Sequence, residues 1–126
     1  MRLLLDTHIV LWWLSDSPRL AKRSKKLIAR NAEVFVSAAT AWEIAIKRSL
    51  GKLQAPDDLE AALAASRFRE LPIAVKHALA AGELPRRHED PFDRLLVAQA
   101  QAENLTLLTS DERLQAYEVP VILNIR

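Results

Sequence analysis

Short apolar runs alternate with longer amphipathic stretches along the chain, and this alternation predicts strands interleaved with helices. The runs that resemble strands buried on both faces are residues 3–5, 34–36, 105–108 and 121–123, with a weaker one at 70–73. Pro72 lacks a backbone N–H, so we expect the weaker strand to lie at an edge of its sheet.

Helical patterns fill the segments between these runs. The predicted helices cover residues 9–14, 18–30, 38–50, 56–68, 74–81, 91–103 and 111–116. Ser37 is a good N-cap, Gly51 is placed to end the third helix, and residues 83–89 are expected to form a loop. Strands that alternate with helices in this way predict an α/β fold, in which helices cover both faces of a parallel sheet.

Composition narrows the class of protein. The chain has 126 residues, half of them hydrophobic, so we expect a single domain spanning residues 1–126. It has no cysteine, which excludes disulfides and thiolate zinc sites and favours a cytoplasmic location. The apolar run at residues 9–14 is too short to cross a membrane, so no membrane association is expected. The net charge of +2 is too small to indicate nucleic-acid binding by itself.

Four acidic residues fall close to the ends of predicted strands or the starts of predicted helices: Asp6, Glu43, Asp93 and Asp111. Ligands of such sheets bind beyond the carboxyl ends of the strands, where the strand order reverses. Clustered carboxylates raise one another's pKa unless a cation lies among them. The four acids therefore indicate a divalent-metal site and, with it, phosphodiester chemistry.

Each acid also has a purely structural explanation. Asp6 and Asp111 can cap the helices that follow them, and Glu43 can form a solvated ion pair with Lys47 one turn later. Asp93 stands in a helical first turn, where the helix dipole favours an acid. Any one acid is explained well enough by these roles, so the metal hypothesis depends on all four falling near strand ends of one alternating fold.

The segments that carry these acids resemble a known family. They read Leu4-Leu5-Asp6-Thr7-His8, Ser37-Ala38-Ala39-Thr40-Ala41-Trp42-Glu43, Asp90-Pro91-Phe92-Asp93-Arg94 and Thr109-Ser110-Asp111. In this order they resemble the PIN-domain ribonucleases and, more narrowly, the VapC-type toxins of toxin–antitoxin pairs. The resemblance spans essentially the whole chain.

The resemblance implies a three-layer fold whose five-stranded parallel sheet has the order 3-2-1-4-5. It implies that the four acids hold Mg²⁺, with Mn²⁺ as a substitute, and that Thr7, Thr40, Thr109 and Ser110 support them. It further implies metal-assisted hydrolysis of RNA, a cognate antitoxin and a homodimer. The substrate could be tRNA, rRNA or mRNA.

Basic residues must hold RNA beside a cluster of acids, because the acids alone would repel it. The candidates are Lys47, Arg48, Arg86, Arg87 and Arg94, whereas the basic run at residues 19–30 is expected to be solvated surface. The three histidines, His8, His77 and His88, show no zinc spacing, and His88 is grouped with the basic loop.

Two other classes of protein remain open. One is a receiver-type signalling domain, which also gathers Mg²⁺ at strand ends but requires adjacent acids after its first strand, where this chain has only Asp6. The other is an RNA- or protein-binding module that has lost turnover. DNA also remains open as a substrate, since nothing in the chain reads a 2′-hydroxyl.

Overall fold

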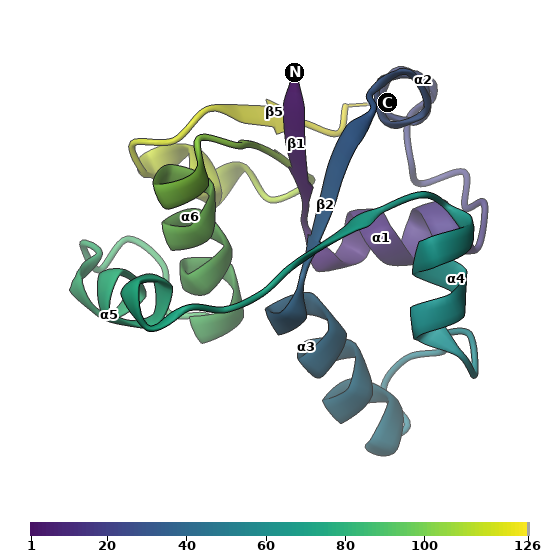
Figure 1. Ribbon diagram of the computed structural model, residues 1–126, viewed down its shortest axis with the longest axis horizontal. Coiled ribbons are helices and arrows are strands. Elements are labelled where there is room, and N and C mark those ends of the chain that lie inside the picture. Colours follow the sequence, from purple (N-terminus) through teal and green to yellow (C-terminus); the bar gives the residue numbers. More distant parts are fainter. Residues whose placement is uncertain (126) are drawn as a thin grey trace.

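Five parallel strands form a central sheet in the computed structural model, which describes residues 1–125 (Figure 1). The strands are β1 (Arg2–Leu5), β2 (Glu33–Ser37), β3 (Arg69–Leu71), β4 (Thr106–Thr109) and β5 (Val121–Leu123). Their spatial order is β3-β2-β1-β4-β5, as the family resemblance implies. The order reverses between β1 and β4, which therefore flank the crevice in which such sheets bind ligands.

Each face of the sheet has its own apolar core. Leu3 and Leu5 point to one face and Leu4 to the other, as the twofold period of a strand requires. All three leucines are fully buried, so β1 lies at the centre of the protein. A strand buried on both faces reads as an uninterrupted apolar run, which is why its position could be predicted.

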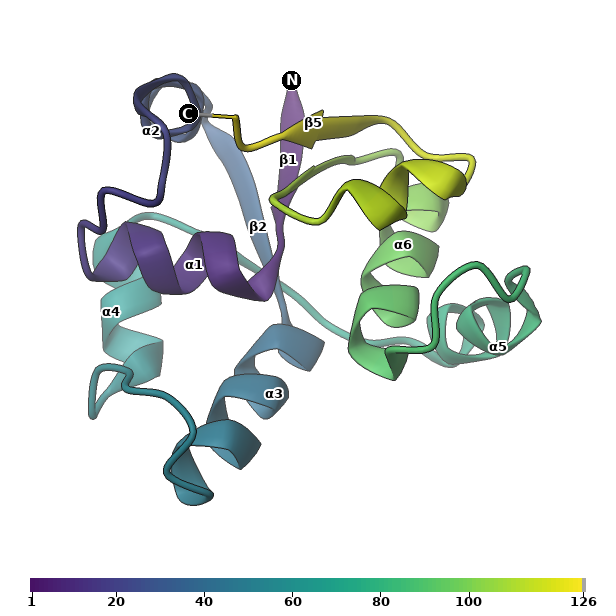
Figure 2. The same ribbon diagram turned by 180° about the vertical axis from the view of Figure 1, so that it is seen from behind.

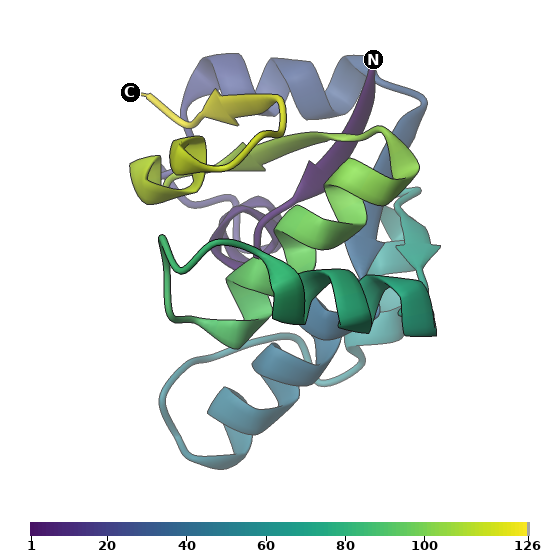
Figure 3. The same cartoon turned by 90° about the vertical axis from the view of Figure 1, so that its left-hand side faces the viewer.

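Helices cover both faces, and this part of the prediction is also confirmed. They are α1 (Thr7–Leu14), α2 (Lys22–Arg30), α3 (Ala38–Ser49), α4 (Leu59–Ala65), α5 (Val75–Glu83), α6 (Pro91–Glu103) and the 3-10 segment η1 (Glu112–Ala116). Residues of α1, α2 and α4 pack into one core, and residues of α6 and η1 into the other (Figure 2). Seen from the side, α5 and α6 lie in front of the strands and α2 behind them (Figure 3). Within residues 1–125, no helix combines the length and the apolar character that a membrane span needs.

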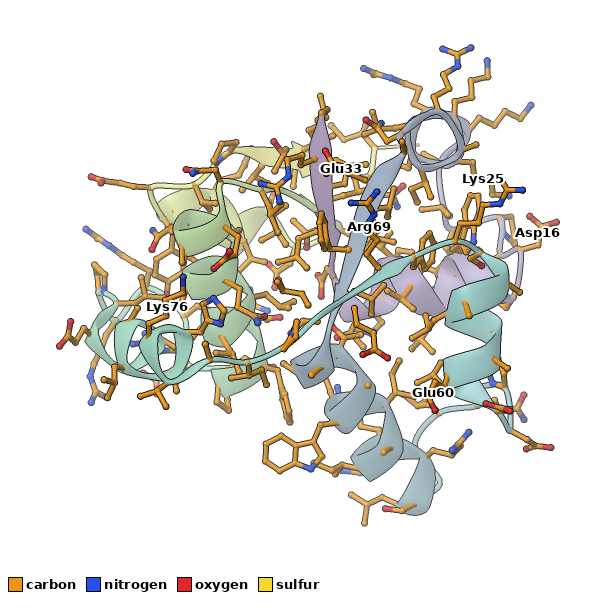
Figure 4. All side chains as sticks on the ribbon, viewed as in Figure 1. Asp16, Lys25, Glu33, Glu60, Arg69 and Lys76 are labelled. Atoms are coloured by element: carbon orange, nitrogen blue, oxygen red, sulfur yellow. The ribbon has the colours of Figure 1, made fainter. Side chains whose placement is uncertain are left out.

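Strand β3 lies at the edge, as Pro72 predicts. The guanidinium of Arg69 lies 3.3 Å from Glu33 Oε1 and ties this short strand to β2 (Figure 4). Lys25 makes a similar surface pair with Asp16 at 3.0 Å, close to the turn that precedes α2. Exposed pairs of this kind add little stability, so packing holds the edge in place.

Three predicted helix boundaries are wrong. The second helix begins at Lys22 and not at Pro18, because Ala21 N–H donates to the side chain of Asn124 at 2.8 Å, a contact that local sequence cannot reveal. The fourth helix begins at Leu59, because Asp58 caps it by accepting from Ala61 N–H at 3.0 Å. The fifth helix runs to Glu83, past its expected end at residue 81.

Other local signals act as predicted. Ser37 caps α3 by accepting a hydrogen bond from Ala39 N–H at 3.0 Å, and Gly51 adopts a left-handed φ of 68° after that helix. Ser37 Oγ also donates to Gln99 Oε1 at 2.5 Å, which joins the start of α3 to the middle of α6. These contacts fix the helices that carry Glu43 and Asp93 relative to the sheet.

Candidate metal and active site

The four predicted acids come from four different elements at one edge of the sheet. Asp6 directly follows β1 and Asp111 lies two residues after β4, on either side of the reversal in strand order. Glu43 lies on α3, which follows β2, and Asp93 lies in the first turn of α6. In Figure 1, β1 and β2 run toward the starts of α1 and α3, so the carboxyl ends of the strands open onto these helices.

Asp6 caps helix α1 with one carboxylate oxygen and binds strand β4 with the other. Its Oδ1 accepts from Thr7 N–H at 2.6 Å, whereas its Oδ2 accepts from Thr109 Oγ1 at 2.5 Å. Burial raises the pKa of this carboxyl above its ordinary value, although the two hydrogen bonds oppose the shift. Capping therefore accounts for one oxygen, and the other is held across the sheet by β4.

Glu43 forms the expected pair with Lys47, but its carboxylate is buried and only the lysine side of the pair is solvated. Lys47 Nζ lies 2.6 Å from Glu43 Oε2, and the Glu43 side chain is only 6% exposed. Thr7 Oγ1 donates to the other oxygen, Oε1, at 2.6 Å, and Thr40 Oγ1 lies 3.4 Å from the same hydroxyl. The hydrogen bond from Lys47 to Glu43 raises the pKa of the ammonium group. Thr7 thus connects Asp6, through its backbone, to Glu43, through its side chain.

Asp93 does not cap its own helix. Asp90 does so, accepting from the N–H groups of Phe92 and Asp93 at 2.8 and 3.3 Å. The carboxylate of Asp93 instead meets His88, whose Nε2 lies 2.7 Å from Asp93 Oδ2 and 3.8 Å from Asp111 Oδ2. Burial and the charge of nearby Asp6 raise the pKa of Asp93 to about 7. A largely buried acid whose pKa is raised this far is a candidate functional group.

Asp111 completes the group. Its backbone N–H donates to Thr109 Oγ1 at 3.0 Å, so one threonine contacts two of the four acids. Arg113 binds the Asp111 carboxylate through Nε and Nη2 at 3.0 and 2.8 Å. This hydrogen bonding lowers the pKa of Asp111, in contrast to that of Asp6 and of Asp93. Ser110 is exposed and makes no side-chain hydrogen bond within the described part of the chain.

A continuous path of contacts thus joins all four acids. The residues along this path are, in order, Glu43, Thr7, Asp6, Thr109, Asp111, His88 and Asp93. Acids that serve only as separate helix caps need no such connection. The arrangement concentrates negative charge at one edge of the sheet and holds each carboxylate in a fixed direction.

Some of the predicted basic residues bind backbone carbonyls of the protein itself, and others are exposed in a loop. The guanidinium of Arg94 donates to the carbonyls of Ala81 and Leu84, both at 2.9 Å, and more weakly to those of Pro85 and His88, so it holds the α5–α6 loop. Arg48 donates to the carbonyl of Pro56 at 2.5 Å. Arg86 and Arg87 are exposed in the α5–α6 loop, beside His88 in the sequence.

Sequence reasoning missed His88 and Arg113 as members of this group. The cap at Asp90 gave no indication that the histidine two residues before it turns back onto Asp93. A His and an Asp five residues apart, separated by Asp-Pro, could have raised the possibility, because the Pro-initiated helix reverses the chain direction there. Arg113 follows Asp111 by two residues, and this closeness in the sequence is the signal for their ion pair.

The donor atoms suit a divalent cation. Carboxylate oxygens are the ligands that Mg²⁺ and Mn²⁺ take, and the group of His88, Asp93 and Asp111 offers three ligand atoms within 4.8 Å of one another. The raised pKa of Asp93, caused in part by Asp6, shows that these acids repel one another. A cation among them relieves that repulsion, so the residues fit the group that the family uses.

Comparisons with known proteins agree with this fold. The PIN domain family model matches residues 3–120. Ribonuclease VapC22 from Mycobacterium tuberculosis is 30% identical over 120 residues, which cover 93% of this chain and 92% of that protein. The solved structure of VapBC2 from Rickettsia felis, bound to a DNA fragment from its promoter, superposes with a TM-score of 0.73 at 20% identity, covering 98% of each chain. DNA-bound VapBC from Salmonella typhimurium gives 0.71 at 19% identity, covering 99% of each chain. The chain therefore belongs to the PIN-domain family, and within that family it groups with the VapC-type proteins.

Proposed function

We propose that this protein is a metal-dependent endoribonuclease that acts as the toxin of a toxin–antitoxin pair. The observation that carries the proposal is the continuous path of contacts that joins Asp6, Glu43, Asp93 and Asp111 at the carboxyl edge of the sheet. The similarity to Ribonuclease VapC22 supports hydrolysis of RNA as the reaction. Because the chain belongs to the PIN-domain family, the receiver-type alternative is excluded.

Asp6, Glu43, Asp93 and Asp111 are the residues that would hold Mg²⁺ or Mn²⁺. When bound, the cation supplies a water of lowered pKa and neutralises charge that develops on the phosphate during in-line displacement. Thr109 keeps Asp6 Oδ2 directed toward β4, and Thr7 orients Glu43. A carboxylate at this edge would accept the proton that the attacking water loses.

Basic side chains around the acids would hold the RNA backbone. Arg86 and Arg87 are exposed in the α5–α6 loop, and Arg86 borders a hollow of about 210 Å³ that His88 also lines. Lys47 lies between Glu43 and a larger groove, so its ammonium group can reach a phosphate if it leaves Glu43. Arg94 is left out of this surface, because its guanidinium holds the loop from within.

We also propose a cognate antitoxin as the partner that silences the site. The VapBC structures to which this chain is similar support such a partner. A groove of about 770 Å³ between α1 and the segment after α3 is lined by Leu11, Trp12, Leu53 and Lys47, among others. An apolar segment of another protein could lie there and approach Glu43 from one side. A homodimer and a cytoplasmic location complete the proposal.

The decisive experiment incubates purified protein with end-labelled structured RNAs, tRNA included, in Mg²⁺, in Mn²⁺ and in EDTA. The Asp6→Asn and Asp93→Asn variants remove a charge at the acid cluster, and Asp57→Asn is the matched control at an exposed site. Thermal melts establish that all three variants fold. We expect discrete metal-dependent cuts from the wild type and the control, and none from the two cluster variants.

Three other results would count against the proposal. Cleavage that survives EDTA or both cluster substitutions would point to a contaminating nuclease. Metal binding without cleavage of any RNA would favour the non-catalytic binding module instead. Cleavage of a matched DNA strand at an equal rate would remove RNA as the specific substrate.

A further inference from the structure

His88 places a ring nitrogen among the acids of the proposed metal site. Its Nε2 lies 2.7 Å from Asp93 Oδ2 and 3.8 Å from Asp111 Oδ2. The imidazole is only 7% exposed, so bulk water has little access to it. The four acids offer only oxygen ligands, so the nitrogen of His88 is a donor of a different kind.

The loop that carries His88 is held firmly enough to fix the ring. The carbonyl of His88 accepts from Arg94 Nη1 at 3.4 Å and from the Tyr117 hydroxyl at 3.5 Å. Arg94 also holds the carbonyls of Ala81 and Leu84, so one guanidinium ties the end of α5 to the start of α6. Tyr117, which follows η1, connects the same loop to the segment that carries Asp111.

The distances suit three ligands of one cation. In octahedral coordination with bonds of roughly 2.1 Å, neighbouring ligand atoms are about 3 Å apart and opposite ones about 4.2 Å. The nitrogen of His88 and one oxygen each from Asp93 and Asp111 all lie within 4.8 Å of one another. Small side-chain rotations would bring the three atoms to coordination distance.

The other two histidines have different environments. His77 uses both ring nitrogens away from the site: Nδ1 accepts from Ala74 N–H at 2.9 Å, and Nε2 pairs with Glu103 at 2.8 Å. His8 is exposed on α1, with its ring 5.7 Å from that of Trp12. Neither belongs to the group of possible ligands found among residues 1–125.

We propose that His88 is a nitrogen ligand of the metal site, together with Asp93 and Asp111, and that it biases the site toward Mn²⁺ over Mg²⁺. The inference rests on the metal site of the proposed function and adds a ligand and a metal preference to it. Mn²⁺ is a first-row transition ion that accepts nitrogen as well as oxygen ligands, although it binds them more weakly than the later ions of the row do, whereas Mg²⁺ prefers oxygen ligands and retains its waters. A site of oxygens alone would lack that preference.

A direct test detects the nitrogen without any RNA. Electron spin-echo envelope modulation is recorded on the intact protein with Mn²⁺ alone, and again on protein whose histidines carry ¹⁵N. We expect ¹⁴N modulation from a coordinated imidazole in the first sample and its replacement by a ¹⁵N signal in the second. The His88→Asn variant should lose the modulation, and His8→Asn, the matched control, should retain it.

Calorimetric titration of the same proteins with Mn²⁺ and with Mg²⁺ measures the preference. Replacement of His88 by Asn should weaken Mn²⁺ binding by about tenfold or more, the loss typical of a disturbed metal site. Mg²⁺ binding should weaken by less than about threefold, because water can replace a nitrogen that Mg²⁺ gains little from. His88→Gln is a second variant, used if the Asn variant does not fold.

The outcomes separate this inference from the proposed function. Mn²⁺ that binds the wild type without a histidine signal would overturn the role of His88 and leave the carboxylate site intact. Equal losses for Mn²⁺ and Mg²⁺ in the His88 variants would overturn the metal preference. No binding of Mn²⁺ to the wild type would overturn this inference, and no binding of either ion would overturn the metal-dependent function as well.

Discussion

Thr109 Oγ1 donates a hydrogen bond of 2.5 Å to Asp6 Oδ2 and accepts one of 3.0 Å from the backbone N–H of Asp111. Thr109 is fully buried at the end of β4, beside β1 in the sheet. One hydroxyl therefore sets the relative positions of two acids that are far apart in the sequence. The pairing of β1 with β4 is what brings them together.

We predict that Thr109→Val weakens both the fold and the site. Valine has the shape of threonine but leaves the buried Asp6 oxygen without its donor. Loss of a hydrogen bond to a charged group costs about 1–3 kcal/mol of unfolding free energy. Metal affinity should fall by about 10- to 100-fold, as for other residues that orient a ligand. Chemical denaturation and titration with Mn²⁺ measure the two effects.

Thr106→Val on the same strand is the matched control, because Thr106 is only half-buried and lies away from the acids. It should change neither quantity appreciably. Equal effects from the two substitutions would mean that threonine on β4 serves strand stability alone.

Stability in the absence of metal should depend on pH through Asp93. The pKa of Asp93 is raised from 3.8 to about 7 by burial and by Asp6, so the folded protein binds this proton more tightly than the unfolded chain. Stability should then fall as pH rises between those two values and level off above pH 7. Between pH 6 and pH 8 the expected loss is on the order of 1 kcal/mol.

Urea denaturation in EDTA at several pH values measures this dependence. Asp93→Asn cannot ionise, so its stability should vary less with pH over the same range. A wild type that becomes more stable from pH 6 to pH 8 in EDTA would contradict the assignment. Added Mn²⁺ should reverse the trend, because the cation binds the ionised carboxylates.

The fold was predictable because its signals are local and agree with one another. Residues 3–5 form an apolar run that is typical of a buried strand, and Ser37 caps the helix that it was expected to cap. The strand order came from the family resemblance and not from the pattern itself. The start of α2 was not predictable, because it depends on Asn124, which lies 103 residues away from Ala21.

The site was predictable only in part, for the same reason. The acids could be chosen because each stands near the end of a strand or the start of a helix. Their partners could not, since Thr7 reaches Glu43 and Thr109 reaches Asp6 only after the strands have paired. His88 was assigned to a solvent-facing basic loop, whereas Arg94 holds that loop so that the imidazole is buried against Asp93.

Arg113 should act against the metal. Its guanidinium binds both oxygens of Asp111 and lowers the pKa of that carboxyl, as a cation in the site also would. Arg113→Ala frees the carboxylate and removes a positive charge, so Mn²⁺ binding should tighten by about two- to fivefold, the range of exposed ion pairs. Calorimetric titration with Mn²⁺ measures the change.

Arg23→Ala on α2 is the control, since it removes the same charge at an exposed position on another element. It should leave the affinity unchanged. If Arg113→Ala weakens binding instead, then Arg113 orients Asp111 for the metal and does not compete with it.

The last prediction concerns the surface that is proposed to hold RNA. Arg86 and Arg87 are both exposed in the loop that also carries His88, so together they can contact two phosphates next to the acids. Each phosphate contact on a single strand contributes about 0.7 to the slope of log affinity against log salt, so their joint replacement by alanine should reduce the slope by about 1.4. Affinity in 0.1 M salt should fall by about tenfold.

The measurement uses fluorescence anisotropy of labelled RNA, in the Asp6→Asn background so that the RNA stays intact. The control is Lys22→Ala with Lys26→Ala, which removes the same charge from α2, at the end of the sheet opposite the acids (Figure 1). That pair should change the slope by less than half as much. Equal losses from both pairs would extend the RNA surface to α2, against the expectation that its basic residues are only solvated. No loss from the Arg86 and Arg87 pair would leave Lys47 and Arg113 as the cations nearest the acids, and their bonds to Glu43 and Asp111 would then have to break when RNA binds.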